Sequence, residues 1–394
     1  MKQPALAQAA YEQLNTLPYY NSFFQSTTPS TALLSKSLTD LLAHRSEGYN
    51  HVFFSSGGSE ANDTNVKMVL RYWQLLNQPQ RKIFIARNLA YHGSTVAASC
   101  LGGFDVMHNQ MGIKPLDVAH IMHPDYWALA NEGENEHDFG LRAAQDLERK
   151  ILEVGADNVA AFIAEPVQGA GGVFIPPESY WPEIQRIVDK YGILFISDEV
   201  ICAFGRLGTA FGFEKFGTSP DLVTFAKGVT NGAIPLGGSI ISDKIGKVLL
   251  EKGGELFHGY TYSGHPVACA VGLKTLEILR EEHLIEQIAN IKSPYLTQKF
   301  ELLKSHPLVG DAKIMGFIGV IQLAKDKEKR QAFDSTLGVG MICRKHCKNH
   351  GLIMRAVGDR MIIAPPFTMT LAQIDEMVEK IRFCLDDTLA EISK

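Results

Sequence analysis

Short, continuously apolar runs alternate along this chain with segments of helical periodicity. The runs cover residues 51–55, 82–86, 159–164, 193–197 and 222–226, and the helical stretches between them include residues 61–76, 141–154 and 182–191. A run that is apolar at every position is typical of a strand buried on both faces of a sheet, since a half-exposed strand alternates. The alternation of such strands with helices predicts an α/β architecture with a mostly parallel sheet.

The pattern changes near residue 279, which indicates a second domain. A charged helix is predicted over residues 280–292, a strand pair near residues 314–323 and a final helix from Leu371. At the other end, residues 5–17 predict a helix that stops before Pro18. A chain of 394 residues is longer than one hydrophobic core usually supports. We expect an N-terminal segment over residues 1–40, a large domain over 41–285 and a small domain over 286–394.

Composition excludes several classes of function. The net charge is −5, from 38 Lys and Arg against 43 Asp and Glu, so no basic field is available for a nucleic acid. Apolar runs are too short to span a bilayer, and the first residues lack a secretion signal. The six cysteines are too sparse for a disulfide framework and fit a reducing compartment. We expect a cytoplasmic protein that binds neither nucleic acid nor membrane.

One cluster has the look of a metal site. Cys343, His346, Cys347 and His350 follow a Cys-x2-His-Cys-x2-His spacing within a stretch that is predicted to be helical. Structural zinc sites usually draw their ligands from separate knuckles rather than from one helix. We therefore favour a helix that buries small thiols, and we expect no metal here.

Two charged residues leave the predicted sheet at the ends of its strands. Asp198 follows the run 193–197, and Lys227 follows the run 222–226. In an open parallel sheet the carboxyl ends of the strands share one edge, where ligands bind. An aspartate that keeps a pyridine nitrogen protonated and a lysine that forms a Schiff base are the two groups that pyridoxal 5'-phosphate (PLP) needs most. Spacing alone leaves a buried Asp–Lys ion pair as the alternative.

Three further segments follow predicted strands. The Gly-rich turn at residues 55–61 opens a helix, where backbone N–H groups favour a phosphate, although a simple helix cap fits equally well. Tyr91 could stack on a planar ring or pack in the core. The loop after Glu165 is rich in glycine, and its function does not follow from the residues alone.

Seven motifs occur in the order found in the class III aminotransferases. They are Ser59-Glu60-Ala61-Asn62, Tyr91-His92-Gly93, Glu165-Pro166, Asp198-Glu199-Val200, Phe204-Gly205-Arg206, Lys227-Gly228 and Thr261-Tyr262-Ser263-Gly264-His265-Pro266. The chain resembles the amine:pyruvate branch of that family, the ω-transaminases, over nearly its whole length. The resemblance implies PLP fold type I, with a mostly parallel seven-stranded sheet in the large domain and a smaller α+β domain. It also implies a homodimer with active sites at the interface, or a tetramer of such dimers.

The resemblance assigns cofactor roles to individual residues. Lys227 is implied as the Schiff-base lysine and proton shuttle, and Asp198 as the partner of the pyridine nitrogen. The other implied cofactor-binding residues are Gly58 and Ser59 at the phosphate, Tyr91 and Val200 on the two ring faces, Glu165 near Asp198, Thr261 at the phosphate of the partner subunit, and His92.

Substrate roles follow from the same resemblance. Arg355 is implied as the mobile arginine that binds the carboxylate of pyruvate or alanine and moves aside for an apolar amine. Phe23, Phe24 and Tyr260 are implied as aromatics that line the pocket. The expected reaction moves an amino group from an amine or ω-amino acid to pyruvate or a similar 2-oxo acid.

Family members carry a further N-terminal segment, whereas the match here begins near Ala5. We therefore expect a segment that is shortened relative to the family, and the alternative function is a truncated, catalytically weak or silent PLP-binding homologue. A PLP decarboxylase or aminomutase is a second alternative, which Arg355 disfavours. A nicotinamide dehydrogenase is a third, disfavoured because no dinucleotide fingerprint follows the first strand.

Overall fold

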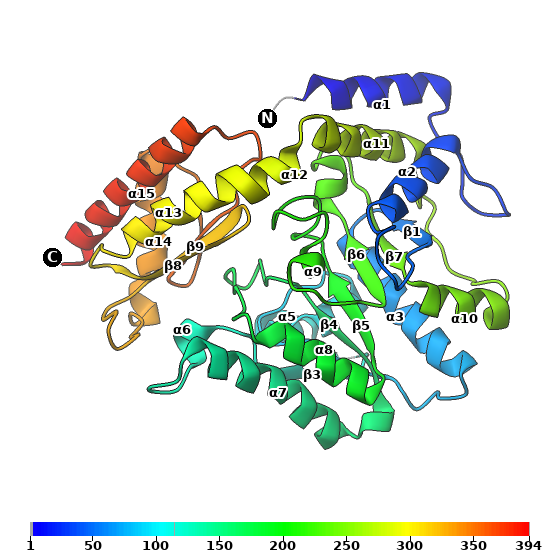
Figure 1. The fold of residues 1–394 in the computed structure, drawn as a ribbon, viewed down its shortest axis with the longest axis horizontal. Helices are drawn as coiled ribbons and strands as arrows, with labels where there is room; N and C mark the ends of the chain where they lie inside the picture. The colour runs from blue at the N-terminus through cyan, green and yellow to red at the C-terminus, as the bar shows by residue number, and fades with distance from the viewer. Residues whose placement is uncertain (1–2, 114, 394) are drawn as a thin grey trace.

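A computed structural model describes residues 3–113 and 115–393, and its larger part is built on a seven-stranded sheet (Figure 1). The strand order is β1-β7-β6-β5-β4-β2-β3. The strands are β1 His51–Ser55, β2 Ile83–Arg87, β3 Val118–Ile121, β4 Val159–Ala164, β5 Leu194–Asp198, β6 Leu222–Phe225 and β7 Gly237–Ile241. Only β7 runs antiparallel to its neighbours β1 and β6. The expected α/β fold with a mostly parallel seven-stranded sheet is confirmed.

Helices cover both faces of this sheet, as the continuously apolar strands predict. Phe162 and Phe195 pack on α7 (Glu136–Val154) and α8 (Tyr180–Tyr191). Their chain neighbours Ile163 and Ile196 point the other way and share a core with α3 (Gly58–Leu75) and α10 (Asp243–Gly253). Every position of β4, β5 and β6 is buried, which is why no polar alternation appears in their sequences.

The C-terminal part has a core of its own around a four-stranded antiparallel sheet of order β10-β11-β9-β8. Its strands are β8 Val309–Met315, β9 Ile318–Leu323, β10 Arg355–Val357 and β11 Arg360–Ile363, and its helices are α13 Ser293–Leu303, α14 Val339–Asn349 and α15 Leu371–Ile392. The final helix begins at the expected residue because Thr370 and Gln373 form a capping box.

The N-terminal helices α1 (Pro4–Thr16) and α2 (Pro29–Asp40) both pack on α11 (Pro266–Glu281). In Figure 1, α1 runs along the outer side of α11. The remaining short helices are α4 Val96–Leu101, α5 Asp105–Met111, α6 Tyr126–Leu129, α9 Gly212–Lys215, η1 Ala156–Asn158, η2 Lys227–Thr230 and η4 Ser335–Leu337. Within the described ranges, no helix has the length and apolar character needed to cross a bilayer.

The prediction of one charged helix over residues 280–292 is wrong. Helix α11 ends at Glu281, α12 covers only Leu284–Gln287, and the π-helical turn η3 (Ile288–Lys292) leads into α13. The break falls at His283, whose φ of 47° lies in the left-handed region that a right-handed helix cannot continue through. Charge periodicity gave no sign of this single backbone reversal.

The Cys/His cluster lies on α14 and at its C-cap, on the side that packs against α15. Cys343 and Cys347 are buried in the C-terminal core. His346 Nε2 lies 2.9 Å from Glu391, and His350 Nε2 lies 2.7 Å from Asp387, so both imidazoles face carboxylates of α15. Among the residues with described placement, no group of three or more His, Cys, Asp or Glu side chains is arranged to hold a metal ion.

Candidate active site

Asp198 and Lys227 end neighbouring strands at one edge of the large sheet. Asp198 is the last residue of β5, and Lys227 opens η2 directly beyond β6. The two strands are parallel, with Asp198 opposite Thr224. Both residues line a cavity of about 340 Å³, together with Tyr91, Glu165, Val200 and the turn at residues 56–59. The structure thus brings together most of the cofactor residues that the resemblance implies.

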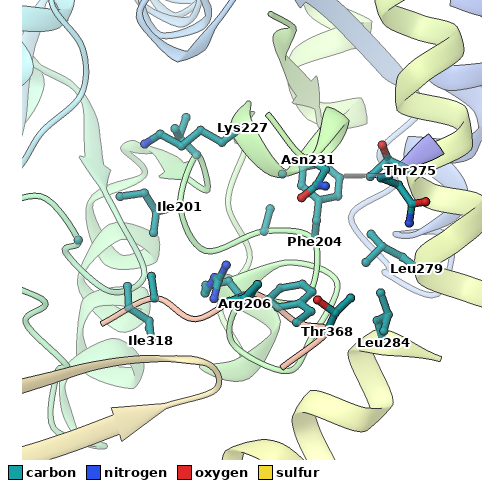
Figure 2. A pocket seen from close by; sticks show the side chains of 18 of the residues that line it. Ile201, Phe204, Arg206, Lys227, Asn231, Thr275, Leu279, Leu284, Ile318 and Thr368 are labelled. Atoms are coloured by element: carbon teal, nitrogen blue, oxygen red, sulfur yellow. The ribbon is translucent and has the colours of Figure 1, made fainter. Parts of the chain in front are cut away.

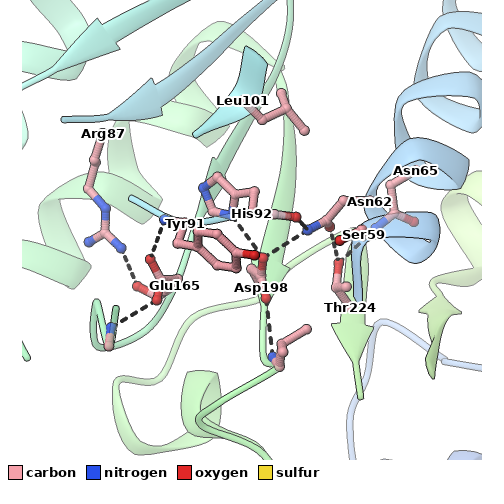
Figure 3. Close-up of polar contacts among 12 residues, drawn as sticks. Ser59, Asn62, Asn65, Arg87, Tyr91, His92, Leu101, Glu165, Asp198 and Thr224 are labelled. Carbon is pink, nitrogen blue, oxygen red and sulfur yellow. Dashed lines mark hydrogen bonds and ion pairs between the residues drawn. The ribbon is translucent and has the colours of Figure 1, made fainter. Parts of the chain in front are cut away.

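Asp198 is bound on both carboxylate oxygens (Figure 3). Oδ2 accepts hydrogen bonds from Asn62 Nδ2 at 2.9 Å and from His92 Nδ1 at 2.8 Å. Oδ1 accepts one from the Val200 N–H at 3.1 Å. The side chain is 3% exposed, yet it lines the cavity. The ionisable side chain that contacts Asp198 is His92 rather than Lys227, so the arrangement differs from the Asp–Lys ion pair that spacing alone allowed.

Lys227 is an exposed lysine in a strained backbone conformation. Its φ is 40°, in the left-handed region that a residue with a Cβ seldom adopts. Such strain is concentrated at functional sites, where the surrounding structure holds it in place. The side chain lines both the cavity beside Asp198 and a second, larger cavity. Lys227 therefore lies where a cofactor and a substrate could meet.

The turn before α3 provides an anion site at the rim of the smaller cavity. The first intrahelical hydrogen bond is made by Ala61 N to Gly57 O, and the Ser56 N–H donates to Glu60 Oε2 at 2.8 Å. The N–H groups of residues 58–60 are therefore the ones left for a ligand. Gly58 is required by space, since a Cβ there would lie 2.7 Å from Val200 Cγ2. A Cβ on Gly93 would lie 2.6 Å from Ser59 Oγ. Backbone can thus approach a phosphate closely here. The cap interpretation is not supported, because no side chain of the described residues caps α3 and Ser59 Oγ accepts from the Ser94 N–H at 3.1 Å instead.

Tyr91 and Glu165 form the side of the cavity opposite α3. The Tyr91 N–H and the Gly169 N–H both donate to the Glu165 carboxylate, at 3.1 and 2.8 Å. Burial raises the pKa of the Glu165 carboxyl, which is 3% exposed. The Tyr91 hydroxyl is bonded to Ser94 at 2.9 Å, and its ring lines the cavity. Cavity size and donor set suit PLP: a lysine, an aspartate, an aromatic ring and a helix N-terminus.

A larger cavity of about 940 Å³ extends from Lys227 to residues 353–368 in the C-terminal part of the chain (Figure 2). Lys227 and Ile201 lie at one end of the view, and Leu279 and Leu284 at the other. Arg355 also lines this cavity, and its Nη2 donates to Ala170 O at 3.1 Å. Among the contacts of the described residues, that bond to a loop carbonyl is the one hydrogen bond of Arg355, so its guanidinium keeps donors for a carboxylate.

Four of the implied site residues line neither of these two cavities. Phe24 is 92% exposed, and Phe23 packs against Gly259. The Tyr260 hydroxyl donates to Glu60 O at 3.1 Å. Thr261 is exposed, with its carbonyl bound by Tyr19. Within one chain these residues do not reach Lys227, and their proposed roles need a second subunit.

Arg360 joins the C-terminal sheet to the loop that lines the larger cavity. Its Nε donates to Gly172 O at 2.8 Å, and its Nη1 pairs with Asp125 at 3.0 Å. Its guanidinium also lies over the ring of Phe174, 4.6 Å from the centroid. Sequence analysis missed this residue, because its partners are separated from it by up to 235 positions.

His123 packs beside Arg360 and Phe174, and it makes the stability of the protein sensitive to acid. The imidazole lies 4.5 Å from the Phe174 ring. Burial lowers its pKa from 6.5 to about 4, and Arg87 and Arg360 add to the effect against Asp125. The unfolded chain therefore binds the extra proton first, and stability rises with pH between about 4 and 6.5. Acidification through this window should cost about 3 kcal/mol from His123.

The variant His123→Phe keeps the ring and removes the titration. We measure the unfolding free energy by urea titration at pH values between 4 and 6.5. In His123→Phe we expect this free energy to change less with pH than in the wild type. His137→Phe, at an exposed position of α7, is the control and should keep the wild-type slope. An unchanged slope in His123→Phe would contradict the assignment.

The fold and the lining of the smaller cavity define a class of protein: PLP enzymes of fold type I. The family model described as aminotransferase class-III matches residues 1–385, so the chain belongs to the class III aminotransferases. It is 51% identical over 387 residues to a putrescine–pyruvate aminotransferase of Pseudomonas aeruginosa, covering 98% of this chain and 84% of that protein. A vanillin aminotransferase of Capsicum annuum is 41% identical, covering 97% of this chain and 83% of the relative.

Solved structures agree with this family. A structure described as a transaminase with L-Ala superposes with a TM-score of 0.95 at 34% identity, covering 100% of this chain and 92% of the other. A thermostable (S)-enantioselective ω-transaminase from Thermomicrobium roseum gives a TM-score of 0.92 at 39% identity, covering 98% of this chain and 85% of the other. The chain is thus a PLP-dependent transaminase, as the resemblance implied.

Proposed function

We propose that this enzyme moves an amino group from an amine or ω-amino acid to pyruvate or a similar 2-oxo acid. The observation that carries the proposal is the placement of Asp198 and Lys227 at one sheet edge, facing a cavity of about 340 Å³ that opens into a larger one. The 51% identity to a putrescine–pyruvate aminotransferase supports an amine donor and pyruvate as acceptor. A diamine is therefore the first donor to test.

Each residue at the cavity has a separate task in this reaction. PLP, when bound, supplies an electron sink for the carbon that carries the amino group. Lys227 holds the cofactor through Nζ and, once released, moves the proton at the substrate carbon. Asp198 keeps a proton on the ring nitrogen. Gly58 and Ser59 bind the phosphate with backbone N–H groups at the start of α3.

Further contacts position the ring and the rest of the site. Tyr91 and Val200 would lie on the two ring faces, with His92 and Glu165 beside Asp198. All four line the smaller cavity, which supports these roles. The proposed domain division, with boundaries at residues 40 and 285, would place this cofactor site in the large domain and Arg355 in the small one.

The site would be completed by a second copy of the chain. We propose a homodimer, or a tetramer of such dimers, in which Thr261 reaches the partner subunit's phosphate and Phe23, Phe24 and Tyr260 line its pocket. Large exposed aromatics in this region support the proposal, since Phe24 is 92% and Tyr262 60% exposed. A cytoplasmic location is proposed as well, because the six cysteines are buried free thiols.

A substitution at Arg355 tests whether pyruvate is the amino acceptor. In Arg355→Leu we expect the KM for pyruvate to rise about 10- to 100-fold, because a charge-assisted hydrogen-bond pair to the carboxylate is lost. The rate of amino transfer from an amine without a carboxylate should stay near wild type. The measurement is alanine formation with putrescine, a β-amino acid and an arylalkylamine as donors at varied pyruvate.

Arg382→Leu, an exposed arginine on α15, is the matched control and should leave both constants unchanged. Equal KM values for pyruvate in Arg355→Leu and wild type would remove Arg355 from the acceptor site. Failure of every amine donor with pyruvate would contradict the proposed reaction and favour a weak or silent homologue.

A further inference from the structure

A line of buried amide and hydroxyl groups leads from the centre of the large domain to Asp198 (Figure 3). Asn65 Nδ2 donates to Thr224 Oγ1 at 2.8 Å, and Thr224 Oγ1 donates to Asn62 Oδ1 at 2.8 Å. Asn62 Nδ2 then donates to Asp198 Oδ2 at 2.9 Å. The two asparagines are one turn apart on α3, Thr224 is on β6, and all three are 0% exposed.

In each of these three hydrogen bonds, the donor is on the side away from Asp198 and the acceptor is on the side toward it. Asn65 donates to Thr224, so the single hydroxyl proton of Thr224 is left for Asn62 Oδ1. That contact fixes the orientation of the Asn62 amide. Its two N–H groups then face two acceptors, His92 O at 2.7 Å and Asp198 Oδ2 at 2.9 Å. A reversed amide would place Oδ1 against a carboxylate oxygen, which is repulsive.

The two oxygens of Asp198 are consequently unequal. Oδ2 accepts from two side chains, Asn62 and His92, whereas Oδ1 accepts only from the Val200 N–H among the contacts of the described residues. These hydrogen bonds hold the Asp198 carboxylate in one orientation. Because the line is buried, breaking one of its contacts leaves a polar atom without a partner, which is costly. Asn65 Oδ1 and His92 Nε2 already have no hydrogen-bond partner among the described residues.

We infer that Asn62 and Thr224 are positioning residues that set the strength of the Asp198 pairing with the cofactor's ring nitrogen. Neither lines the two cavities that meet at Lys227, so both act through Asp198. The inference rests on the proposed role of Asp198 and does not depend on which amine or 2-oxo acid reacts. Loss of the Thr224 hydroxyl frees the Asn62 amide to turn, weakens the hold on Asp198 and lowers ring protonation.

The test uses the holoenzyme reconstituted with PLP labelled with 15N in the ring, without substrate. Thr224→Val is close in shape and removes only the hydroxyl, whereas Thr224→Ser restores it. Thr388→Val is the matched control, since Thr388 is equally buried and donates to Cys384 O at 2.6 Å in α15. Ring protonation is measured from the 15N chemical shift, and kcat and KM are measured separately.

In Thr224→Val we expect the 15N shift to move toward that of an unprotonated ring. We also expect kcat to fall about tenfold with KM unchanged, the size of one buried hydrogen-bond partner lost. Thr224→Ser and Thr388→Val should match wild type in both readouts. If Thr224→Val does not fold, Asn62→Ala on α3 tests the same contact and should shift the signal likewise.

A wild-type 15N shift in Thr224→Val, or in Asn62→Ala, would overturn the inference even if activity fell. The proposed function fails in a different way, because a wild-type chain that binds the labelled PLP but transfers no amino group leaves the ring signal intact.

Discussion

Lys227→Ala is expected to abolish amino transfer. The substitution removes both the covalent attachment point and the base at the substrate carbon, and the proton transfer alone is worth about 10²- to 10⁴-fold. Lys227→Arg should be equally inactive, because its guanidinium keeps the positive charge but cannot give up a proton at working pH. The measurement is alanine formation from pyruvate and putrescine under saturating PLP.

Lys247→Ala is the control, since Lys247 is an exposed lysine on α10. Without PLP, both Lys227 variants should unfold near the wild-type temperature, because alanine and arginine carry the same Cβ at this φ of 40° and the Lys227 side chain is exposed. Wild-type turnover in either variant would remove Lys227 from the chemistry.

Asp198→Asn is the second substitution with a large expected effect. The amide is close in size to the carboxylate but lacks the charge that holds a proton on the ring nitrogen, and loss of one such electrostatic contact costs about 10²- to 10³-fold in kcat. Its amino group would also face donors from Asn62, His92 or the Val200 N–H. We expect low kcat, weaker PLP binding and a changed visible spectrum.

A buried carboxylate with a structural role provides the comparison. Asp221→Asn alters a side chain that is 9% exposed and accepts from the Phe195 N–H at 2.9 Å in the same sheet. It should lower stability without altering the spectrum of bound PLP. If Asp198→Asn behaved like Asp221→Asn, with stability lost and the spectrum retained, Asp198 would be a structural residue.

The sequence predicts those parts of the site that lie at the ends of continuously apolar strands. Continuous apolar runs mark β4, β5 and β6, and the parallel arrangement of β5 and β6 then requires Asp198 and Lys227 to share an edge. The family resemblance supplied the cofactor. Strands β3 and β7 were not among the predicted runs, so neither their positions nor the reversed direction of β7 between β1 and β6 was predicted.

Residues that act through distant partners were missed for a physical reason. Thr224 reads as one more position of a buried strand, and Asn62 as part of a helix, until packing of α3 on the sheet brings them within 2.8 Å. Arg360 likewise depends on contacts between the C-terminal sheet and the loops at Gly172 and Asp125. Phe23, Phe24, Tyr260 and Thr261 remain predictions, because their proposed contacts belong to a second subunit.

The most direct test of the account is a pair of half-reactions on the purified holoenzyme. Putrescine added without pyruvate should remove the visible absorbance of bound PLP, and pyruvate added afterwards should restore it while one alanine forms per site. This outcome is predicted for an active amine:pyruvate transaminase. Retention of the absorbance with every amine, or its loss without alanine on adding pyruvate, would contradict the proposed function.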